Sequence, residues 1–189
     1  MKVVGINGSV RKDGNTALMI RMVFEELEKE GIETELIQLG QDWIPPCRGC
    51  MGCRGNKNCV FTDDKFCEYF QKLLDADVII LGSPVYSADV TANLKAFMER
   101  AGIVVSTNRG IFRHKVAAAV AAVRRGGAMP TVDSMNHFLL NKEVYLVGSN
   151  YWNMGFGRNI GEFLNDEEGV RNMHNLGENM AWLLKKICE

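Results

Sequence analysis

Four of the six cysteines of this chain lie within thirteen residues, in the segment "CRGCMGCRGNKNC". Cys47, Cys50 and Cys53 recur at every third position, and Cys59 follows after five intervening residues. Local runs of cysteines separated by two residues are typical of [4Fe–4S] clusters, which are held by four thiolates. The spacing therefore predicts an iron–sulfur site formed by Cys47, Cys50, Cys53 and Cys59.

Two other interpretations of these cysteines remain open, a zinc site and a loop that binds nothing. Structural zinc sites generally use two separated pairs of cysteines, which this run does not resemble. Arg48, Arg54 and Lys57 lie in the same segment and would offset the negative charge of a thiolate-bound cluster. These cations favour the cluster. The remaining two cysteines, Cys67 and Cys188, are expected to be packing or surface residues.

The bulk composition is that of an ordinary globular protein. The chain has 189 residues, of which 47% are hydrophobic and 24% charged, so a single domain spanning 1–189 is expected. The formal net charge of −1 provides no basic surplus for nucleic acid.

The apolar runs are too short for a signal peptide or a membrane span, so we expect a cytoplasmic protein with no membrane partner. Disulfides rarely persist in that compartment, which favours a metal-binding or redox role for the cysteines.

The residues between these motifs alternate between strand and helix patterns. Apolar runs, one of them alternating with polar residues, predict strands at 2–6, 32–39, 77–82, 115–123 and 143–148. Helical periodicity predicts helices at 15–30, 64–76, 91–101, 128–140 and 166–186. This order predicts an α/β fold with a doubly wound parallel sheet. The loops that follow the strands then meet at one edge, where ligands bind in such sheets.

Two segments are too irregular for simple strand-to-helix loops. One is the cysteine-rich loop at 42–63, and the other is 149–165, which begins a C-terminal loop and helix extension at 149–189. Both follow a predicted strand, so both should emerge at the ligand-binding edge. Long loops in compact domains are usually functional, which makes these two segments candidates for parts of a site.

The turn after the first strand, "NGSVRKDGNTALM", has the residues for an anion site. Ser9, Arg11, Asn15 and Thr16 lie beside the start of a helix, whose free N–H groups and partial positive charge attract anions. The segment has neither the glycine spacing of a dinucleotide fold nor a P-loop. It predicts a phosphate site, with the alternative that Asn15 only caps the helix and Ser9 only shapes the turn.

The segment "LGSPVYSADVTANLKAFMERAG" follows the next central strand. Pro84 constrains a turn, and Val85, Tyr86 and Ser87 present backbone polar groups beside an aromatic ring. This arrangement suits a planar ligand. An ordinary proline turn is the alternative.

The strand predicted at 115–123 ends in the motif "VRRGG". Gly126 and Gly127 would allow close approach of the backbone to a ligand, and Arg124 and Arg125 could pair with its charges. Arginines in a surface loop are usually solvated, so Arg124 and Arg125 are the weaker candidates.

The three loops together resemble the flavodoxin-like NAD(P)H-dependent FMN reductase family, over nearly the whole chain. The resemblance implies a five-stranded parallel sheet in the order 2-1-3-4-5, with helices on both faces and the cysteine-rich loop after strand 2. It also implies FMN as a cofactor. The implied phosphate ligands are Ser9, Arg11, Asn15 and Thr16. The implied flavin-ring contacts are Pro84, Val85, Tyr86, Ser87, Gly126 and Gly127, with Arg124 nearby.

The cysteine run and its position resemble the iron–sulfur flavoprotein branch of that family. The resemblance implies an FMN-dependent oxidoreductase that passes electrons between FMN and a [4Fe–4S] cluster, in a homodimer or homotetramer. NAD(P)H, a small electron-carrier protein or a small-molecule acceptor would be its redox partner. No catalytic side chain is predicted, because flavin carries the chemistry. The loop around Trp152 also resembles a segment of this branch, and would cover the flavin or pack against a neighbouring subunit.

Two other functions remain open for such a chain. The first is a cluster-free NAD(P)H-dependent reductase of flavin or quinone. The second is a non-enzymatic electron carrier or redox sensor, whose cluster or thiols would report oxidation.

Overall fold

The computed structural model describes residues 1–188, and the side chain of Cys188, expected to pack or lie on the surface, falls outside the described part. The strands are β1 (Lys2–Asn7), β2 (Glu33–Ile37), β3 (Val78–Pro84), β4 (Val116–Val123), β5 (Tyr145–Leu146) and β6 (Met154–Phe156). The α-helices are α1 (Asn15–Lys29), α2 (Phe66–Asp75), α3 (Ala92–Thr107), α4 (Ala128–Leu140) and α5 (Glu167–Cys188). Two short 3-10 helices, η1 (Leu39–Gln41) and η2 (Glu162–Asn165), complete the described elements. None of these helices has the length and apolarity needed to cross a membrane.

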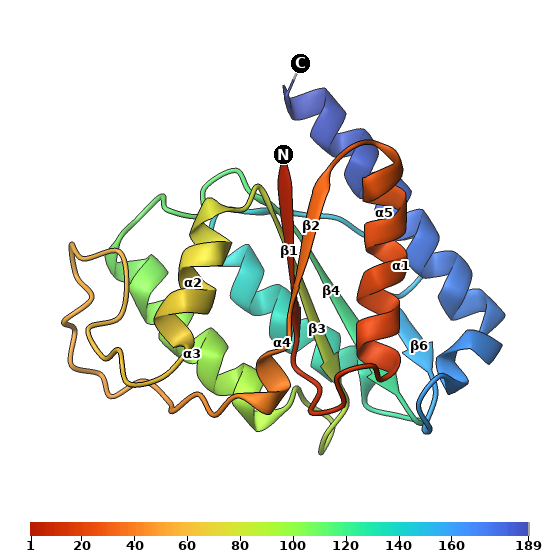
Figure 1. Ribbon diagram of the computed structural model, residues 1–189, viewed down its shortest axis with the longest axis horizontal. Helices are drawn as coiled ribbons and strands as arrows, with labels where there is room; N and C mark the ends of the chain where they lie inside the picture. Colours follow the sequence, from red (N-terminus) through yellow and green to blue (C-terminus); the bar gives the residue numbers. More distant parts are fainter. Residues whose placement is uncertain (189) are drawn as a thin grey trace.

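The strands form a parallel sheet in the order β2-β1-β3-β4-β5, which confirms the predicted topology. The central strand β3 pairs with β1 on one side and with β4 on the other. Every residue of β4 is buried, as expected for a strand covered on both faces. In Figure 1 the strands run downward from the N-terminus, so that the loops after β1, β3 and β4 meet at the lower edge.

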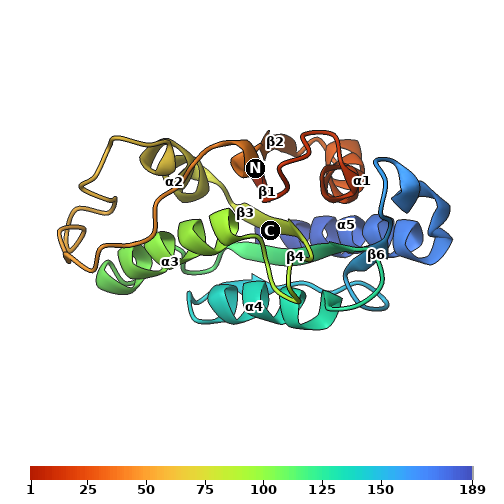
Figure 2. The same cartoon turned by 90° about the horizontal axis from the view of Figure 1, so that it is seen from below.

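Helices cover both faces of the sheet, as Figures 1 and 2 show. α1 and α5 lie on one face, where they pack against Ala118 and Val120 of β4. α2, α3 and α4 lie on the other face, against Ala117 and Ala119. The alternation follows from the strand geometry, in which successive side chains point to opposite faces.

The end of the sheet differs from the prediction. The strand expected at 143–148 is only Tyr145–Leu146, and the segment at 149–165, expected to be irregular, contains β6 and η2. β5 pairs with the start of β4, whereas β6 pairs with its end, at 121–123. The chain therefore leaves the sheet after β5 and then pairs with β4 a second time, through β6. A bond from the Ser149 N–H to Asn153 Oδ1 of 3.2 Å closes the intervening turn.

Helix α3 is longer than predicted. The sequence places its end at Ala101, before Gly102, because glycine costs about 1 kcal/mol inside a helix. The helix instead continues to Thr107, and Val104 and Val105 on its added turns are buried in the core. Their burial offsets the cost of the glycine. The extension matters for the cysteine-rich loop, which lies beside α3 and projects to the left in Figure 1.

Candidate functional site

Loops from three strand ends and from the C-terminal segment line one cavity at the carboxyl edge of the sheet. Most of the residues predicted to contact FMN line it, namely Ser9, Arg11, Asn15, Thr16, Pro84, Val85, Tyr86 and Arg124. Three residues that the sequence did not single out complete the lining, namely Ala122, Gly157 and Arg158. The topology therefore brings the separate motifs to one place.

The turn after β1 leaves the start of α1 open toward this cavity. The Arg11 N–H donates to Ser9 Oγ at 3.1 Å, and the Ser9 N–H donates to Asn7 Oδ1 at 3.0 Å. Gly14 is the N-cap residue of α1, and it provides no side chain to bond the first N–H groups of the helix. Free N–H groups, the positive end of the helix and the Arg11 guanidinium are all suited to an anion.

Asn15 has a different structural role from the helix cap considered above. Its Nδ2 donates to the carbonyl oxygen of Asn159 at 2.9 Å, and its Oδ1 accepts from the Gly161 N–H at 3.0 Å. The Arg11 Nη1 donates to the carbonyl oxygen of Arg158 at 2.9 Å. These bonds hold the segment after β6 against the start of α1. The capping interpretation of Asn15 is therefore wrong.

The segment after β6 supplies Gly157 and Arg158, which sequence reasoning missed. A Cβ at Gly157 would lie 2.6 Å from Asn15 Nδ2, so only glycine permits this close approach. The signal was the "GFGR" motif, whose first two residues end the short strand β6, a strand that the sequence did not reveal. Trp152 of the same segment is 51% exposed and does not line the cavity.

The turn after β3 presents the aromatic ring expected for a planar ligand. Tyr86 and Asp89 exchange two backbone bonds, of 2.9 and 3.0 Å, and Ser87 and Ala88 between them have φ angles of 51° and 59°. The Val85 N–H donates to the carbonyl oxygen of Ala122 at 3.0 Å, which ties the turn to β4. Tyr86 lines the cavity and is 49% exposed, so its ring is open to a ligand.

The glycines after β4 do not line the cavity, and Gly127 instead packs against this turn. Gly127 has a φ of 87°, and a Cβ there would lie 2.9 Å from both Val85 Cγ1 and Ala88 Cα. Glycine is therefore required by both conformation and packing. Ser87, Gly126 and Gly127 are absent from the lining of the cavity, and their contact with a flavin ring stays a prediction.

A second hollow lies between the cysteine-rich loop and α3, and all four clustered cysteines line it. Its other lining residues are Pro45, Pro46, Arg48, Met51, Val60, Phe61, Asp63, Asp64, Arg100, Ile103 and Val104. Its free volume is about 20 Å³, which is the scale of one water molecule. Within residues 1–188, no three side chains of the metal-binding types lie close enough together to hold a metal ion. The thiols surround the hollow without forming a ligand set in this conformation.

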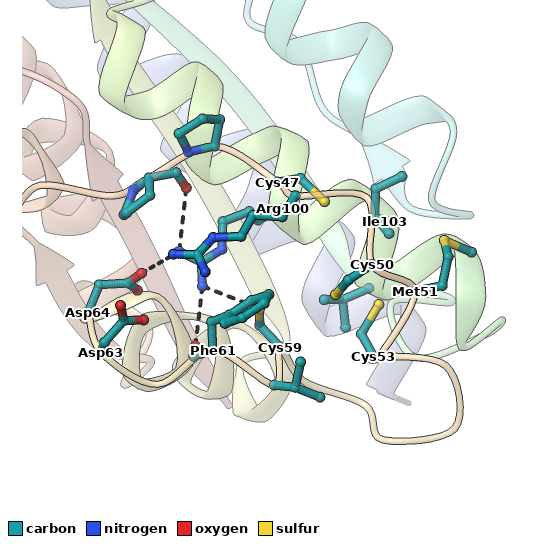
Figure 3. Close-up of a pocket in the computed structure, with 15 residues that line it drawn as sticks. Cys47, Cys50, Met51, Cys53, Cys59, Phe61, Asp63, Asp64, Arg100 and Ile103 are labelled. Carbon is teal, nitrogen blue, oxygen red and sulfur yellow. Dashed lines mark hydrogen bonds and ion pairs between the residues drawn. The ribbon is translucent and has the colours of Figure 1, made fainter.

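The donor set nevertheless fits an iron–sulfur cluster. Four thiols of one short segment face the same hollow, and the loop between η1 and α2 contains no helix or strand that would hold them apart. A buried cation also reaches one of them. Figure 3 shows the guanidinium of Arg100 between Asp64 and Cys59, with contacts to both. Sulfur ligands with a nearby cation are the chemistry of an anionic cluster.

Arg100 is the cation that bonds a cysteine sulfur, a role that the sequence assigned to the cations of the loop. Arg48, Arg54 and Lys57 are exposed, and Arg48 stacks over the Phe61 ring at 4.2 Å. Arg100 is only 4% exposed. It was missed because an arginine in a helical "MERAG" pattern usually faces solvent, and only its helical register with Ile103 and Val104 places it on the hollow.

Cys67 lies close to the hollow but outside its lining. Its Sγ donates to the carbonyl oxygens of Cys59 and Phe61, at 3.4 Å each. Burial raises the pKa of the Cys67 thiol, which keeps it protonated at neutral pH. Cys67 therefore packs, as expected, and supports the backbone beside Cys59.

Side-chain amides of α3 and of its C-cap residue hold the start and the middle of the cysteine-rich loop. The Nδ2 of Asn93 donates to the carbonyl oxygen of Leu39 at 2.8 Å, and its Oδ1 accepts from the Ile44 N–H at 2.9 Å. At the far end of the helix, Asn108 Nδ2 donates to the carbonyl oxygen of Cys53 at 2.9 Å. A single rigid element therefore positions a loop that has little regular structure of its own.

Asp42 connects the start of the loop to α2. Its carboxylate accepts a hydrogen bond from the Tyr69 hydroxyl and forms an ion pair of 3.2 Å with Lys65. The Tyr69 hydroxyl, and after it Lys65, lower the pKa of Asp42. Burial, and after it the Asp42 carboxylate, raise the pKa of Tyr69. The carboxylate of Asp42 is thus stabilised in its charged form by both partners.

The fold is that of the flavodoxin-like α/β proteins. The structure is similar to that of RosB with a bound flavin intermediate, with a TM-score of 0.79 and 16% identity over 100% of this chain and 80% of that chain. It is also similar to an archaeal flavodoxin, with a TM-score of 0.63 and 14% identity over 98% of this chain and 99% of that one. At these identities the similarity shows the fold alone.

Sequence comparisons go further than the fold. Residues 1–159 match the model of the NADPH-dependent FMN reductase family. An iron-sulfur flavoprotein of Methanocaldococcus jannaschii is 39% identical over 99% of both chains, and one of Archaeoglobus fulgidus is 32% identical over 98% of both. The chain belongs to the NADPH-dependent FMN reductase family, in its iron–sulfur flavoprotein branch. It is a flavin-dependent oxidoreductase, and the predictions of family, fold and enzyme class are confirmed.

Proposed function

We propose that FMN binds in the cavity at the carboxyl edge of the sheet. Its phosphate would lie at the start of α1, where Arg11 and free N–H groups offer positive charge. Its ring would lie along Val85 and Tyr86, since this turn presents an exposed aromatic side chain beside backbone polar groups. The family supports the cofactor, and the convergence of the loops on one cavity supports its place.

We further propose that Cys47, Cys50, Cys53 and Cys59 hold a [4Fe–4S] cluster. The single observation that carries this proposal is the hollow that all four line, in a chain 39% identical to an iron-sulfur flavoprotein over its full length. The hollow is small, so the loop must open to admit a cluster. Such opening is compatible with a segment held mainly by side-chain bonds to α3.

The proposed activity is electron transfer between an external donor or acceptor and these two groups. Bound flavin supplies two-electron chemistry and an iron–sulfur cluster supplies one-electron chemistry, so together they interconvert paired and single electrons. The chain's own residues bind and orient the two groups. The donor would be NAD(P)H, in keeping with the family, or a small electron-carrier protein.

The test is an analysis of protein purified without oxygen. We expect about four iron and four sulfide ions per chain together with one FMN, and a brown colour from broad absorption near the flavin bands. Yellow protein without iron that oxidises NAD(P)H rapidly would contradict the cluster and leave a cluster-free flavin or quinone reductase. Protein that holds iron but no flavin would contradict the proposed FMN site.

A further inference from the structure

The cysteine hollow contains a buried cation that the cluster alone does not explain. Arg100 is 4% exposed, and the Asp64 side chain with which it pairs is 8% exposed. Burying both charges is costly unless their hydrogen bonds are satisfied. The structure satisfies them in a specific way, and one of the bonds goes to sulfur.

The guanidinium of Arg100 uses its donors in two directions. Nη1 donates to Asp64 Oδ2 at 2.5 Å and to the carbonyl oxygen of Pro45 at 3.4 Å. Nη2 donates to Cys59 Sγ and to the carbonyl oxygen of Phe61, at 3.3 Å each. Two backbone oxygens, one carboxylate and one cysteine sulfur therefore share a single cation. These bonds join the segments before Cys47 and after Cys59 (Figure 3).

The ring of Phe66 packs against the guanidinium. The Arg100 Cζ lies 4.2 Å from the centre of this ring, and Phe66 is fully buried. A planar guanidinium can bond two partners while it stacks on an aromatic face, which a lysine ammonium cannot do. The geometry at Cys59 is therefore specific to arginine.

We propose that Arg100 is a positioning residue for the cluster site, which orients Cys59 and stabilises the more negative, reduced state of the thiolate-bound group. This inference rests on the proposed function, since it needs a cluster on Cys59. Reduction by one electron adds one negative charge to the site. A buried N–H donor with a full positive charge favours the more negative state, since few water molecules screen it. Outer-shell donors of this kind tune metal sites in general.

The neighbouring Asp64 provides a test of the sign of the expected shift in the midpoint potential of the cluster. Asp64 offsets the positive charge of Arg100, so its loss should strengthen the effect of the arginine on the cluster. Arg100→Gln and Asp64→Asn both break the same buried ion pair and both should lower the thermal midpoint. They should nevertheless move the midpoint potential of the cluster in opposite directions. A purely structural role would give no such opposition.

The experiment is a redox titration of the anoxic protein, with reduction followed by the electron paramagnetic resonance signal of the cluster. For Arg100→Gln we expect the ratio of reduced to oxidised cluster at a given potential to fall about tenfold, which is a downward shift of about 59 mV for one electron. The midpoint potential should fall less in Arg100→Lys than in Arg100→Gln, and it should rise in Asp64→Asn. Arg54→Gln removes an exposed cation from the same loop and should change the ratio less than twofold.

The outcomes separate this inference from the proposed function. Wild-type protein without iron would overturn both. If the wild type holds iron but both Arg100 variants have its midpoint potential, the role of Arg100 alone is overturned. The same holds if the Arg100 and Asp64 variants shift the potential in the same direction. If Arg100→Gln retains no iron, the midpoint potential of Arg100→Lys tests the proposal, and a potential below that of the wild type supports it. An unchanged potential, or loss of iron from Arg100→Lys and Asp64→Asn alike, overturns it.

Discussion

The two candidate sites are built in different ways. The cavity at the sheet edge is lined by the ends of β3 and β4 and by turns that backbone bonds hold to them, such as the bond from Val85 to Ala122. The cysteine hollow is formed by one long loop, and side chains of α3 hold that loop in place. The first site is therefore largely preformed, whereas the second depends on a few side-chain contacts and on the group it would bind.

This difference teaches where each site is vulnerable. The strand ends that line the first cavity keep their positions when one side chain is removed, because the sheet positions their backbone. A loop without regular structure depends more strongly on its individual anchors, since each removed bond frees several residues. Helix α3 connects the two regions, because it begins directly after the Tyr86 turn and continues past the cysteine hollow.

The largest expected effect tests whether the two regions are independent. Cys59→Ala removes one of the four thiols of the hollow and should abolish iron and sulfide binding, while FMN content stays near one per chain. Cys67→Ser is the matched control, since it removes a thiol eight residues away on α2 and outside the hollow but keeps a donor for the carbonyl oxygens of Cys59 and Phe61. Metal and flavin analysis of both anoxic proteins checks this. Loss of iron from both variants, or loss of FMN from Cys59→Ala, would break the comparison.

A smaller effect is expected at the sheet edge. Asn15→Ala removes the bonds that hold the segment after β6 over the start of α1. The loss of these bonds, together with a longer one of 3.4 Å from the Phe163 N–H to Asn15 Oδ1, should raise the dissociation constant for FMN about tenfold, or about 1.4 kcal/mol, with iron content unchanged. Fluorescence titration with FMN measures it. Asn179→Ala removes a similar side-chain bond, to the carbonyl oxygen of Gly148, and serves as control. Equal weakening in both variants would show that the segment after β6 has no special role.

The smallest expected effect concerns the anchor of the loop on α2. The pKa of Asp42 is lowered in the folded protein, so its contribution to stability is complete above the unfolded pKa and is lost as the pH falls through the folded value. Asp42→Asn should lower the free energy of unfolding by about 1 kcal/mol at pH 7. The difference from wild type should narrow below about pH 4.

Thermal unfolding of the two proteins at neutral and acidic pH measures this difference. Asp63→Asn, an exposed carboxylate of the same loop, should behave like the wild type at both pH values. A difference between Asp42→Asn and wild type that stays constant or grows on acidification would contradict the role given to Asp42.

The sequence predicts the sheet order because its strands are strongly apolar and its motifs match a known family. It does not predict β6, because this strand has only three residues, too few to show a periodicity. Its pairing with the end of β4 is visible only in the structure. The turn residues of the cavity were found because glycine, proline and polar residues have local meaning. Arg100 was not found, because its role depends on the tertiary contact between α3 and Cys59, which lies 41 residues earlier in the chain.

Native mass spectrometry of the anoxic protein tests the central claim most directly, because it weighs the chain together with everything bound to it. The wild type should carry the mass of one FMN and of one group of four iron and four sulfide ions per chain. Cys59→Ala should carry the FMN alone. A wild type that binds FMN but no iron or sulfide, or zinc in their place, would contradict the account of the cysteine hollow.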